Sequence, residues 1–392
     1  MKEFKIKNMK RTNYILFLFS LILLLNACKD KTKLDIKKIT GYDNECLKNG
    51  DGLNFKSFKI IPLEATRKSM LTNIQSLKII DSLIIVQEDS GLLCFDLSGK
   101  YNYSYGARGK GPGEHINLSS YYYNKKENTI NIMDIYKKTI LTYKLTGEFV
   151  SSKKFKSNSF PNTYIAEFYR KDKILQVNYI YNKFNTIYSE LDLSTANVRN
   201  MYSLPVESEN GKEKVGENPI SLYGKEIKML IPFDNKIYKL KGDTIEPIYY
   251  IETKEEIVSQ KKLQKIKNYS FFTYSNFMNK KKFYGFGSIF ETQKYLFLGF
   301  NNYSFFLVDK SNNTGKRFNY YVDSKKGLNF LPILCIKAIY KDSFVGIVSN
   351  DKLKEYAENI SDTNQNKNLR YFKNEVSKLT EDNYCLMIYD IK

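Results

Sequence analysis

Two stretches decide the fold: IIDSLIIVQEDSGLLCFDLSGKYNYSY at residues 79–105 and TINIMDIYKKTILTYKLTGEF at residues 129–149. Each contains an apolar run, an acidic residue near the end of that run, a second run, a turn built on Gly99 or Gly147, and a third run. Short runs rich in Val, Ile, Tyr and Phe and bounded by turn residues are typical of β-strands. The chain therefore contains a repeating unit of antiparallel strands.

The spacing of this unit favours a β-propeller. Gly99 and Gly147 are 48 positions apart, which suits propeller blades of roughly 40–50 residues. Weaker copies follow at residues 173–204, 232–251, 295–322, 343–350 and 383–392. We expect residues 54–64 to supply the strand that completes the last blade, because such closure leaves few exposed strand edges. The prediction is an all-β, six-bladed β-propeller over residues 51–392; a β-sandwich or an irregular solenoid is the alternative.

Two charged segments break the strand pattern, at residues 253–268 and 351–379. Their apolar residues recur at a spacing closer to 3.6 than to 2, which is typical of helices. We expect both to be helical insertions between strands. Acidic residues that recur at the blade turns are expected to form Asx turns rather than a catalytic set; they are Asp96, Asp192, Asp309 and Asp390.

A targeting segment precedes the strands. Basic residues are followed by an uncharged, mostly apolar run from Tyr14 to Leu25, which ends at Leu25-Asn26-Ala27-Cys28. The run fits the roughly 7–15 residues of a signal-peptide core and is shorter than the roughly 20 that span a bilayer. Leu-Asn-Ala-Cys resembles the lipobox of bacterial lipoproteins, whose cysteine is lipidated and becomes the first residue.

This resemblance gives the expected organisation of the N-terminus. Residues 1–27 are a signal peptide that starts at Met1 or Met9, and residues 28–50 are a flexible tether, lipid-anchored at Cys28. Acyl chains such as palmitate, at ~0.8 kcal/mol per buried CH₂, hold a protein firmly at a membrane. The alternative is a plain signal anchor in which Cys28 is incidental.

Composition excludes several function classes. The formal net charge is +20, but the lysines are spread over loops without an Arg-rich recognition segment, so no nucleic-acid partner is expected. His115 is the only histidine, which largely removes catalytic triads and His-rich zinc sites. The remaining cysteines lack metal-ligand spacing. Cys335 and Cys385 are either buried thiols or a disulfide.

Three stretches together resemble the six-bladed β-propeller lipoproteins abundant in Bacteroidetes. They are IIPLEATRKSMLTNIQSLKIIDSLIIV (60–86), YGARGKGPGEH (105–115) and PFDNKIYKLKGDTIEPIYYI (232–251). The last residues, 381–392, resemble the family's closing strand, except that Tyr384 stands where proline is expected. The resemblance implies a propeller fold, export and a lipid anchor, and it implies no reaction.

The glycine-rich stretch 105–115 is the best candidate site. It is not a phosphate-binding P-loop, because Gly109-Lys110 is followed by glycine and not by the Ser or Thr that holds Mg²⁺. Its glycines instead permit a sharp turn between blades. Charges of both signs surround the single histidine, so we expect a ligand or partner contact there, made by Arg108, Lys110, Glu114 and His115. Alternatively, Arg108 and Glu114 only brace the loop.

The leading functional hypothesis is an envelope lipoprotein, anchored to the outer membrane, that serves as a ligand- or protein-binding propeller scaffold. Its candidate partners are a glycan, a peptide or an envelope protein; no catalytic residue, metal or cofactor is expected. The alternative is a propeller hydrolase or lyase with a metal in the central channel. That alternative requires acidic side chains directed inward from several blades, and an apolar or lysine-lined channel would count against it.

Overall fold

The structure is a computed structural model, and it describes residues 35–48, 53–155, 162–182, 185–206, 208–265, 282–283, 285–300, 304–319, 333, 335–360, 366–379 and 383–392. The expected signal peptide, Cys28 and the first part of the expected tether lie outside these residues. Within the described part of the chain, no helix is long and apolar enough to cross a membrane.

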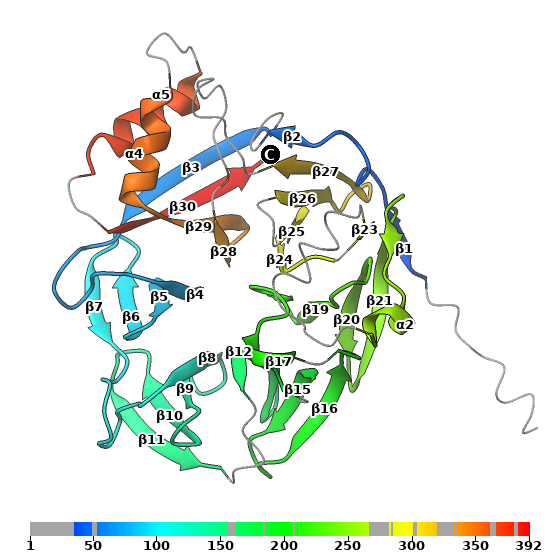
Figure 1. Cartoon of the computed structure of the whole chain (residues 1–392). Coiled ribbons are helices and arrows are strands. Elements are labelled where there is room, and N and C mark those ends of the chain that lie inside the picture. The colour runs from blue at the N-terminus through cyan, green and yellow to red at the C-terminus, as the bar shows by residue number, and fades with distance from the viewer. Residues whose placement is uncertain are drawn as a thin grey trace, which may run out of the picture. The chain divides into compact units, whose positions relative to one another are not determined.

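Six four-stranded antiparallel blades form a ring (Figure 1). Blade 1 consists of β4 (Ile74–Ile80), β5 (Leu83–Glu88), β6 (Gly91–Asp96) and β7 (Tyr101–Ser104). Blade 2 consists of β8 (Leu118–Asn124), β9 (Thr129–Asp134), β10 (Thr139–Lys144) and β11 (Phe149–Lys154). Blade 3 consists of β12 (Thr163–Arg170), β13 (Lys173–Asn178), β15 (Thr186–Asp192) and β16 (Val198–Ser203). Blade 4 consists of β18 (Ile220–Tyr223), β19 (Glu226–Leu230), β20 (Lys236–Lys241) and β21 (Thr244–Ile251). Blade 5 consists of β24 (Ser288–Glu291), β25 (Tyr295–Gly299), β26 (Ser304–Asp309) and β27 (Thr314–Asn319). Blade 6 consists of β28 (Ile336–Tyr340), β29 (Ser343–Ser349), β30 (Tyr384–Ile391) and β3 (Phe55–Pro62). The predicted six-bladed β-propeller is confirmed.

The N-terminal strand closes the ring, as the sequence predicts. β3 pairs antiparallel with β30, with Phe58 opposite Tyr389 and Ile60 opposite Met387. In Figure 1 the blue β3 lies beside the red β30 as the outermost strand of blade 6. Closure therefore joins the two ends of the propeller sequence by backbone hydrogen bonds.

Two further short strands extend the outer edges of blades 4 and 5. β1 (Lys37–Ile39) pairs parallel with β21, and β2 (Leu47–Lys48) pairs parallel with β27. We expected all of residues 28–50 to be a tether, but the described residues from Lys37 onward are hydrogen-bonded to the propeller. The outer edges of both blades are thereby covered, which protects their unpaired backbone groups.

The hydrophobic core lies between neighbouring blades. Val86 of blade 1 packs in one cluster with Val345 and Leu386 of blade 6, and all three are buried. Blade 5 has a stack of aromatic rings, with the centroids of Phe297 and Phe305 4.7 Å apart. Burying side chains of this size contributes about 1.5–3 kcal/mol each. Every blade therefore depends on its neighbours to bury both of its faces.

One of the two predicted helical insertions is confirmed. Within 351–379 the structure has α4 (Asn350–Glu358) and α5 (Lys367–Val376), and α5 buries Leu369, Phe372 and Val376. The prediction for 253–268 is wrong over its described part, which contains β22 (Glu256–Ile257) and a single helical turn, α2 (Gln260–Leu263). β22 is extended because it pairs with β23 (Lys282–Phe283). A second two-stranded sheet joins β14 (Ile180–Asn182) and β17 (Ser208–Glu213).

The blade turns confirm three of the four expected Asx turns. Asp96, Asp192 and Asp309 each accept hydrogen bonds from the backbone N–H and the hydroxyl of the serine two residues later. Asp390 instead lies within β30, which pairs with β3, and its carboxylate accepts a hydrogen bond from the Ser57 hydroxyl at 3.4 Å. Cys335 and Cys385 are both free, so the disulfide alternative is wrong. Cys385 is a buried thiol as predicted, but Cys335 is exposed, so the prediction of a buried thiol is wrong there.

Candidate functional site

The glycine-rich loop between blades 1 and 2 is closed by its own backbone. Gly109 N donates to His115 O at 2.9 Å, and His115 N donates to Ala107 O at 2.9 Å. The Glu114 carboxylate accepts from Gly111 N at 2.7 Å. A Cβ atom at Gly109 would lie 2.1 Å from Glu114 Oε2, so this position requires glycine while Glu114 stays in place. Glu114 therefore braces the loop, as the alternative reading of the sequence holds.

The other three predicted site residues differ in their surroundings. Arg108 and Lys110 are exposed, and neither side chain has a partner among the described residues. His115 is only 3% exposed, and neither of its ring nitrogens has a hydrogen-bond partner in the part of the chain that the structure describes. Burial is the main cause that lowers the pKa of His115, although Asp134 acts in the opposite direction. The imidazole is therefore neutral at pH 7.

The loop borders a polar hollow of about 360 Å³. Arg108 and His115 line it, together with Glu88 at the end of β5 and Asp89 in the turn that follows. Asp89 already accepts from Gln75 Nε2 at 2.7 Å. Lys110 and Glu114 are not part of this lining. The structure thus brings two of the four predicted residues to one hollow, and the ligand-binding role of all four stays a prediction.

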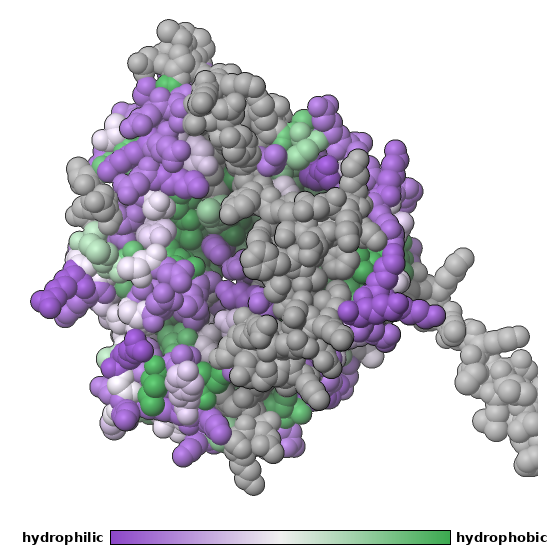
Figure 2. Space-filling view, viewed as in Figure 1, coloured by the Kyte–Doolittle hydropathy of each residue, from purple (hydrophilic) through white to green (hydrophobic). Residues whose placement is uncertain are grey.

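The central channel is a larger hollow of about 730 Å³, lined by the inner strand of every blade. Gln75 lines both this channel and the smaller hollow. In Figure 2 hydrophobic side chains lie deep near the centre of the ring, between hydrophilic ones. Side chains that line it from the inner strands include Ile165, Phe168, Leu222 and Phe290. Its volume is within the roughly 300–1,000 Å³ of typical ligand sites.

The charged lining of the channel is mainly basic. Six lysines and two glutamates line it: Lys78, Lys125, Lys126, Lys214, Lys225, Lys337, Glu167 and Glu217. Lys78 forms an ion pair with Glu167. Lys214 and Lys337 each lie 3.6 Å from Glu217. Desolvation acts to raise the pKa of Glu217, although its side chain is 53% exposed, and the charges of Lys337 and Lys214 prevail, so the pKa is lowered and the carboxylate stays ionised.

The remaining three lysines, which we call the mouth lysines, are Lys125, Lys126 and Lys225. All are exposed, and none forms an ion pair within the described part of the chain. Lys125 and Lys126 follow the inner strand β8, and Lys225 follows the inner strand β18. Because these strands occupy the same place in their blades, the two turns lie at the same end of the channel. The sequence reasoning missed the mouth lysines, since nothing marks two distant turns as neighbours.

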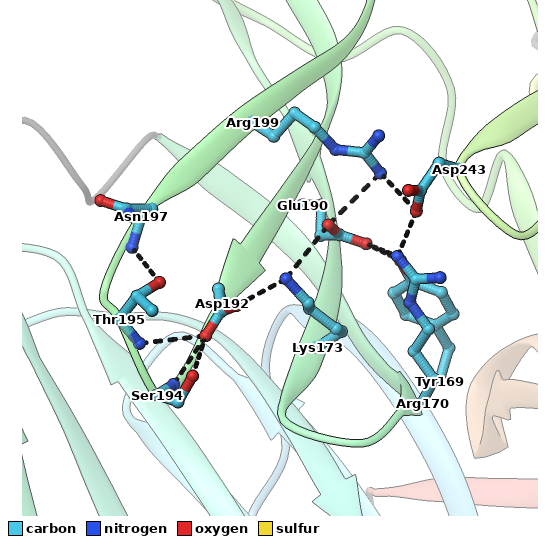
Figure 3. A network of polar contacts seen from close by, with 10 residues as sticks. All are labelled: Tyr169, Arg170, Lys173, Glu190, Asp192, Ser194, Thr195, Asn197, Arg199 and Asp243. Atoms are coloured by element: carbon cyan, nitrogen blue, oxygen red, sulfur yellow. Dashed lines mark hydrogen bonds and ion pairs between the residues drawn. The ribbon is translucent and has the colours of Figure 1, made fainter.

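A second charged cluster links blades 3 and 4, and we call it the blade 3–4 network (Figure 3). Its members are Tyr169, Arg170, Lys173, Glu190, Asp192, Arg199 and Asp243. Glu190 is 4% exposed and contacts Arg170, Arg199 and Lys173 at 2.8, 3.3 and 3.5 Å. Asp243, from the turn between β20 and β21, pairs with both arginines. Burial raises the pKa of Glu190, but hydrogen bonds from Tyr169 and Arg170 prevail and lower it.

Neither cluster has the donor set of a metal site. No group of three or more His, Cys, Asp or Glu side chains among the described residues is arranged to hold a metal ion. The two channel glutamates are each paired with lysine. A lysine-rich lining is the opposite of what a central-channel metal requires.

Comparison with known proteins gives a family for most of the chain and solved structures with a similar fold. A family model described as "Domain of unknown function (DUF4934)" matches residues 35–390. A "putative exported protein" from Bacteroides fragilis NCTC 9343 superposes with a TM-score of 0.65 at 18% identity, covering 91% of this chain and 99% of that one. A member of the DUF4221 family from Bacteroides vulgatus superposes with a TM-score of 0.51 at 11% identity, covering 87% and 98%. No curated protein matches the sequence.

Proposed function

This chain belongs to the DUF4934 family, and from that premise we propose that it is an exported, membrane-anchored binding protein whose propeller channel takes a negatively charged ligand. The observation that carries the proposal is the channel itself. It has the volume of a ligand site, and its six lysines exceed its two glutamates. The three mouth lysines have no carboxylate partner among the described residues, so their charge is available to a ligand.

The geometry supports binding better than catalysis. A metal-dependent hydrolase or lyase would need several free carboxylates at one level of the channel. The channel offers two, and both are neutralised by lysine. Acid–base catalysis by His115 would require the imidazole to reach a substrate, but the ring is buried.

The binding proposal is tested with the full chain in detergent. Calorimetric titration with anionic ligands and with their neutral counterparts is expected to show binding of the anionic forms only. Affinity should fall as salt is raised, because exposed charges are screened. Equal binding of neutral forms, or affinity independent of salt, would overturn the proposal. Turnover of the bound ligand would favour the enzyme alternative.

The membrane anchor is the second part of the proposal, and it rests on the leader and on Cys28. Since the propeller begins near Lys37, the tether is residues 28–36. Replacement of Cys28 by serine is expected to abolish incorporation of labelled palmitate and to release the protein from the membrane fraction. Cys46→Ser is the matched control and should leave both unchanged. Membrane retention of the Cys28→Ser variant would contradict lipid anchoring.

We keep Arg108 as a proposed second contact for the ligand, because it is exposed, has no partner among the described residues and lines the hollow that shares Gln75 with the channel. Arg108→Ala is expected to weaken binding. Lys110→Ala is the matched control, because Lys110 has the same charge two residues away and does not line that hollow. Unchanged binding by Arg108→Ala would remove Arg108 from the site, and equal weakening by the two substitutions would show that the effect of Arg108 does not depend on its place in the hollow.

A further inference from the structure

The channel wall consists of strand edges. β4, β8, β12, β18, β24 and β28 are each the terminal strand of their blade, so each turns one edge toward the channel. Among the described residues, the inner edges of blades 4 and 5 meet at one bridge, between Asn218 and Ser288. An unpaired strand edge presents N–H donors and C=O acceptors in alternation. The channel therefore offers hydrogen-bonding groups from several directions around its axis.

Aromatic rings interrupt this polar wall. Tyr123, Phe168 and Tyr169 line the channel and are each half-buried. Phe168 is held in place by stacking on Tyr122, with centroids 6.4 Å apart and planes 11° apart. Such rings can pack against the C–H groups on one face of a cyclic ligand, while the strand edges form hydrogen bonds with the polar groups around its ring. The lining is thus mixed, with hydrogen-bonding edges, aromatic faces and lysines.

The positive charge is unevenly placed along the channel. Lys78, Lys214 and Lys337 are paired with the channel glutamates. The mouth lysines are not paired within the described chain. An anion entering the channel would therefore place its negative groups at this mouth and its uncharged polar groups farther inside.

We propose that the ligand is an acidic saccharide, whose carboxylate or sulfate groups contact the mouth lysines and whose ring hydroxyls contact the inner strand edges. This inference rests on the proposed function. Sugar hydroxyls project around the whole ring, which matches donors and acceptors that approach from several blades. An extended peptide carries its backbone groups in one plane and pairs with a single strand edge. An acyl chain would leave the edges without hydrogen bonds, which costs free energy.

The test compares ligand classes on the full chain in detergent. Oligosaccharides of galacturonate, alginate, hyaluronan and chondroitin sulfate are titrated beside carboxyl-reduced oligogalacturonate, poly-glutamate and vesicles containing phosphatidylglycerol. At least one acidic oligosaccharide is expected to bind, and the reduced form is not. The variant Lys125→Ala/Lys126→Ala/Lys225→Ala should bind that saccharide about tenfold more weakly, as expected for three exposed ionic contacts.

The matched control is Lys100→Ala/Lys352→Ala/Lys367→Ala, which removes the same charge from exposed positions outside the channel. It is expected to bind like the unmodified chain, and equal weakening by both triple variants would overturn the assignment to the mouth. Binding of poly-glutamate or vesicles without any acidic saccharide would overturn the ligand class and leave the proposed function standing. Binding of none of these anions would overturn both.

Discussion

The blade 3–4 network and the mouth lysines are both charged clusters, but they differ in how the charge is balanced. The network places three cations against three carboxylates, Glu190, Asp192 and Asp243 (Figure 3). The mouth places three lysines together with no described carboxylate in contact. A balanced cluster satisfies itself and stabilises the fold. An unbalanced one adds nothing to the fold, and its charge remains available to a partner.

The largest expected effect of this difference is on stability. Glu190→Gln leaves Arg170, Arg199 and Lys173 around a buried neutral group, and is expected to lower the free energy of unfolding by about 2–4 kcal/mol. This loss is smaller than the loss expected for a fully buried ion pair, because the two arginines are 36% and 42% exposed and keep their ion pairs with Asp243. Urea denaturation measures it.

Asp243→Asn is the matched control for this substitution. Asp243 contacts the same two arginines but is 64% exposed, so a much smaller loss than for Glu190→Gln is expected, because exposed ion pairs contribute little. Similar losses for the two variants would show that the buried position of Glu190 is not what gives the network its strength.

The next effect is a dependence of stability on pH. The pKa of Glu190 in the fold is lowered from its ordinary 4.5, so its contribution is present above pH 4.5 and is lost as pH falls through the folded pKa. The pKa of Asp192 is also lowered, chiefly by the hydrogen bond that its carboxylate accepts from Lys173. The stability difference between the unmodified chain and Glu190→Gln should therefore be constant near neutral pH and shrink below pH 4.5. A difference that grows on acidification would contradict this sign.

The smallest expected effect concerns the mouth. The triple alanine variant of Lys125, Lys126 and Lys225 is expected to change the free energy of unfolding by no more than about 0.5 kcal/mol, because exposed residues without partners carry little stability. Thermal or urea unfolding of this variant, in the absence of ligand, measures it. A loss as large as that of Glu190→Gln would mean that the mouth lysines stabilise the ring, and the contrast between the two clusters would fail.

The sequence was sufficient where structure is local or repeated. Strand runs and turns in 79–105 and 129–149 predicted the first two blades, and the serine two residues after Asp96, Asp192 and Asp309 gave the Asx turns. The sequence-based prediction failed for Asp390, because this residue lies inside strand β30 and not in a turn. It also failed for residues 253–265, where strand pairing prevailed over a helical spacing of apolar residues.

The candidate site was predicted less well than the fold. The glycine-rich loop was recognised, but its structure separates Glu114, which braces the loop, from Arg108, which lines a hollow. The channel lysines were not recognised at all. Their turns lie in blades 2 and 4, and only the ring brings both to one mouth.

The sequence by itself determined the repeated strand unit and the closure of blade 6 by β3, because both depend on neighbouring residues or on a period that the chain displays. The tertiary structure decided the rest. It attached β1 and β2 to blades 4 and 5, paired Lys78 of blade 1 with Glu167 of blade 3, and left the mouth lysines without an ion pair among the described residues. These features join residues far apart in the chain, and their energies depend on distance and burial, which exist only once the ring has closed.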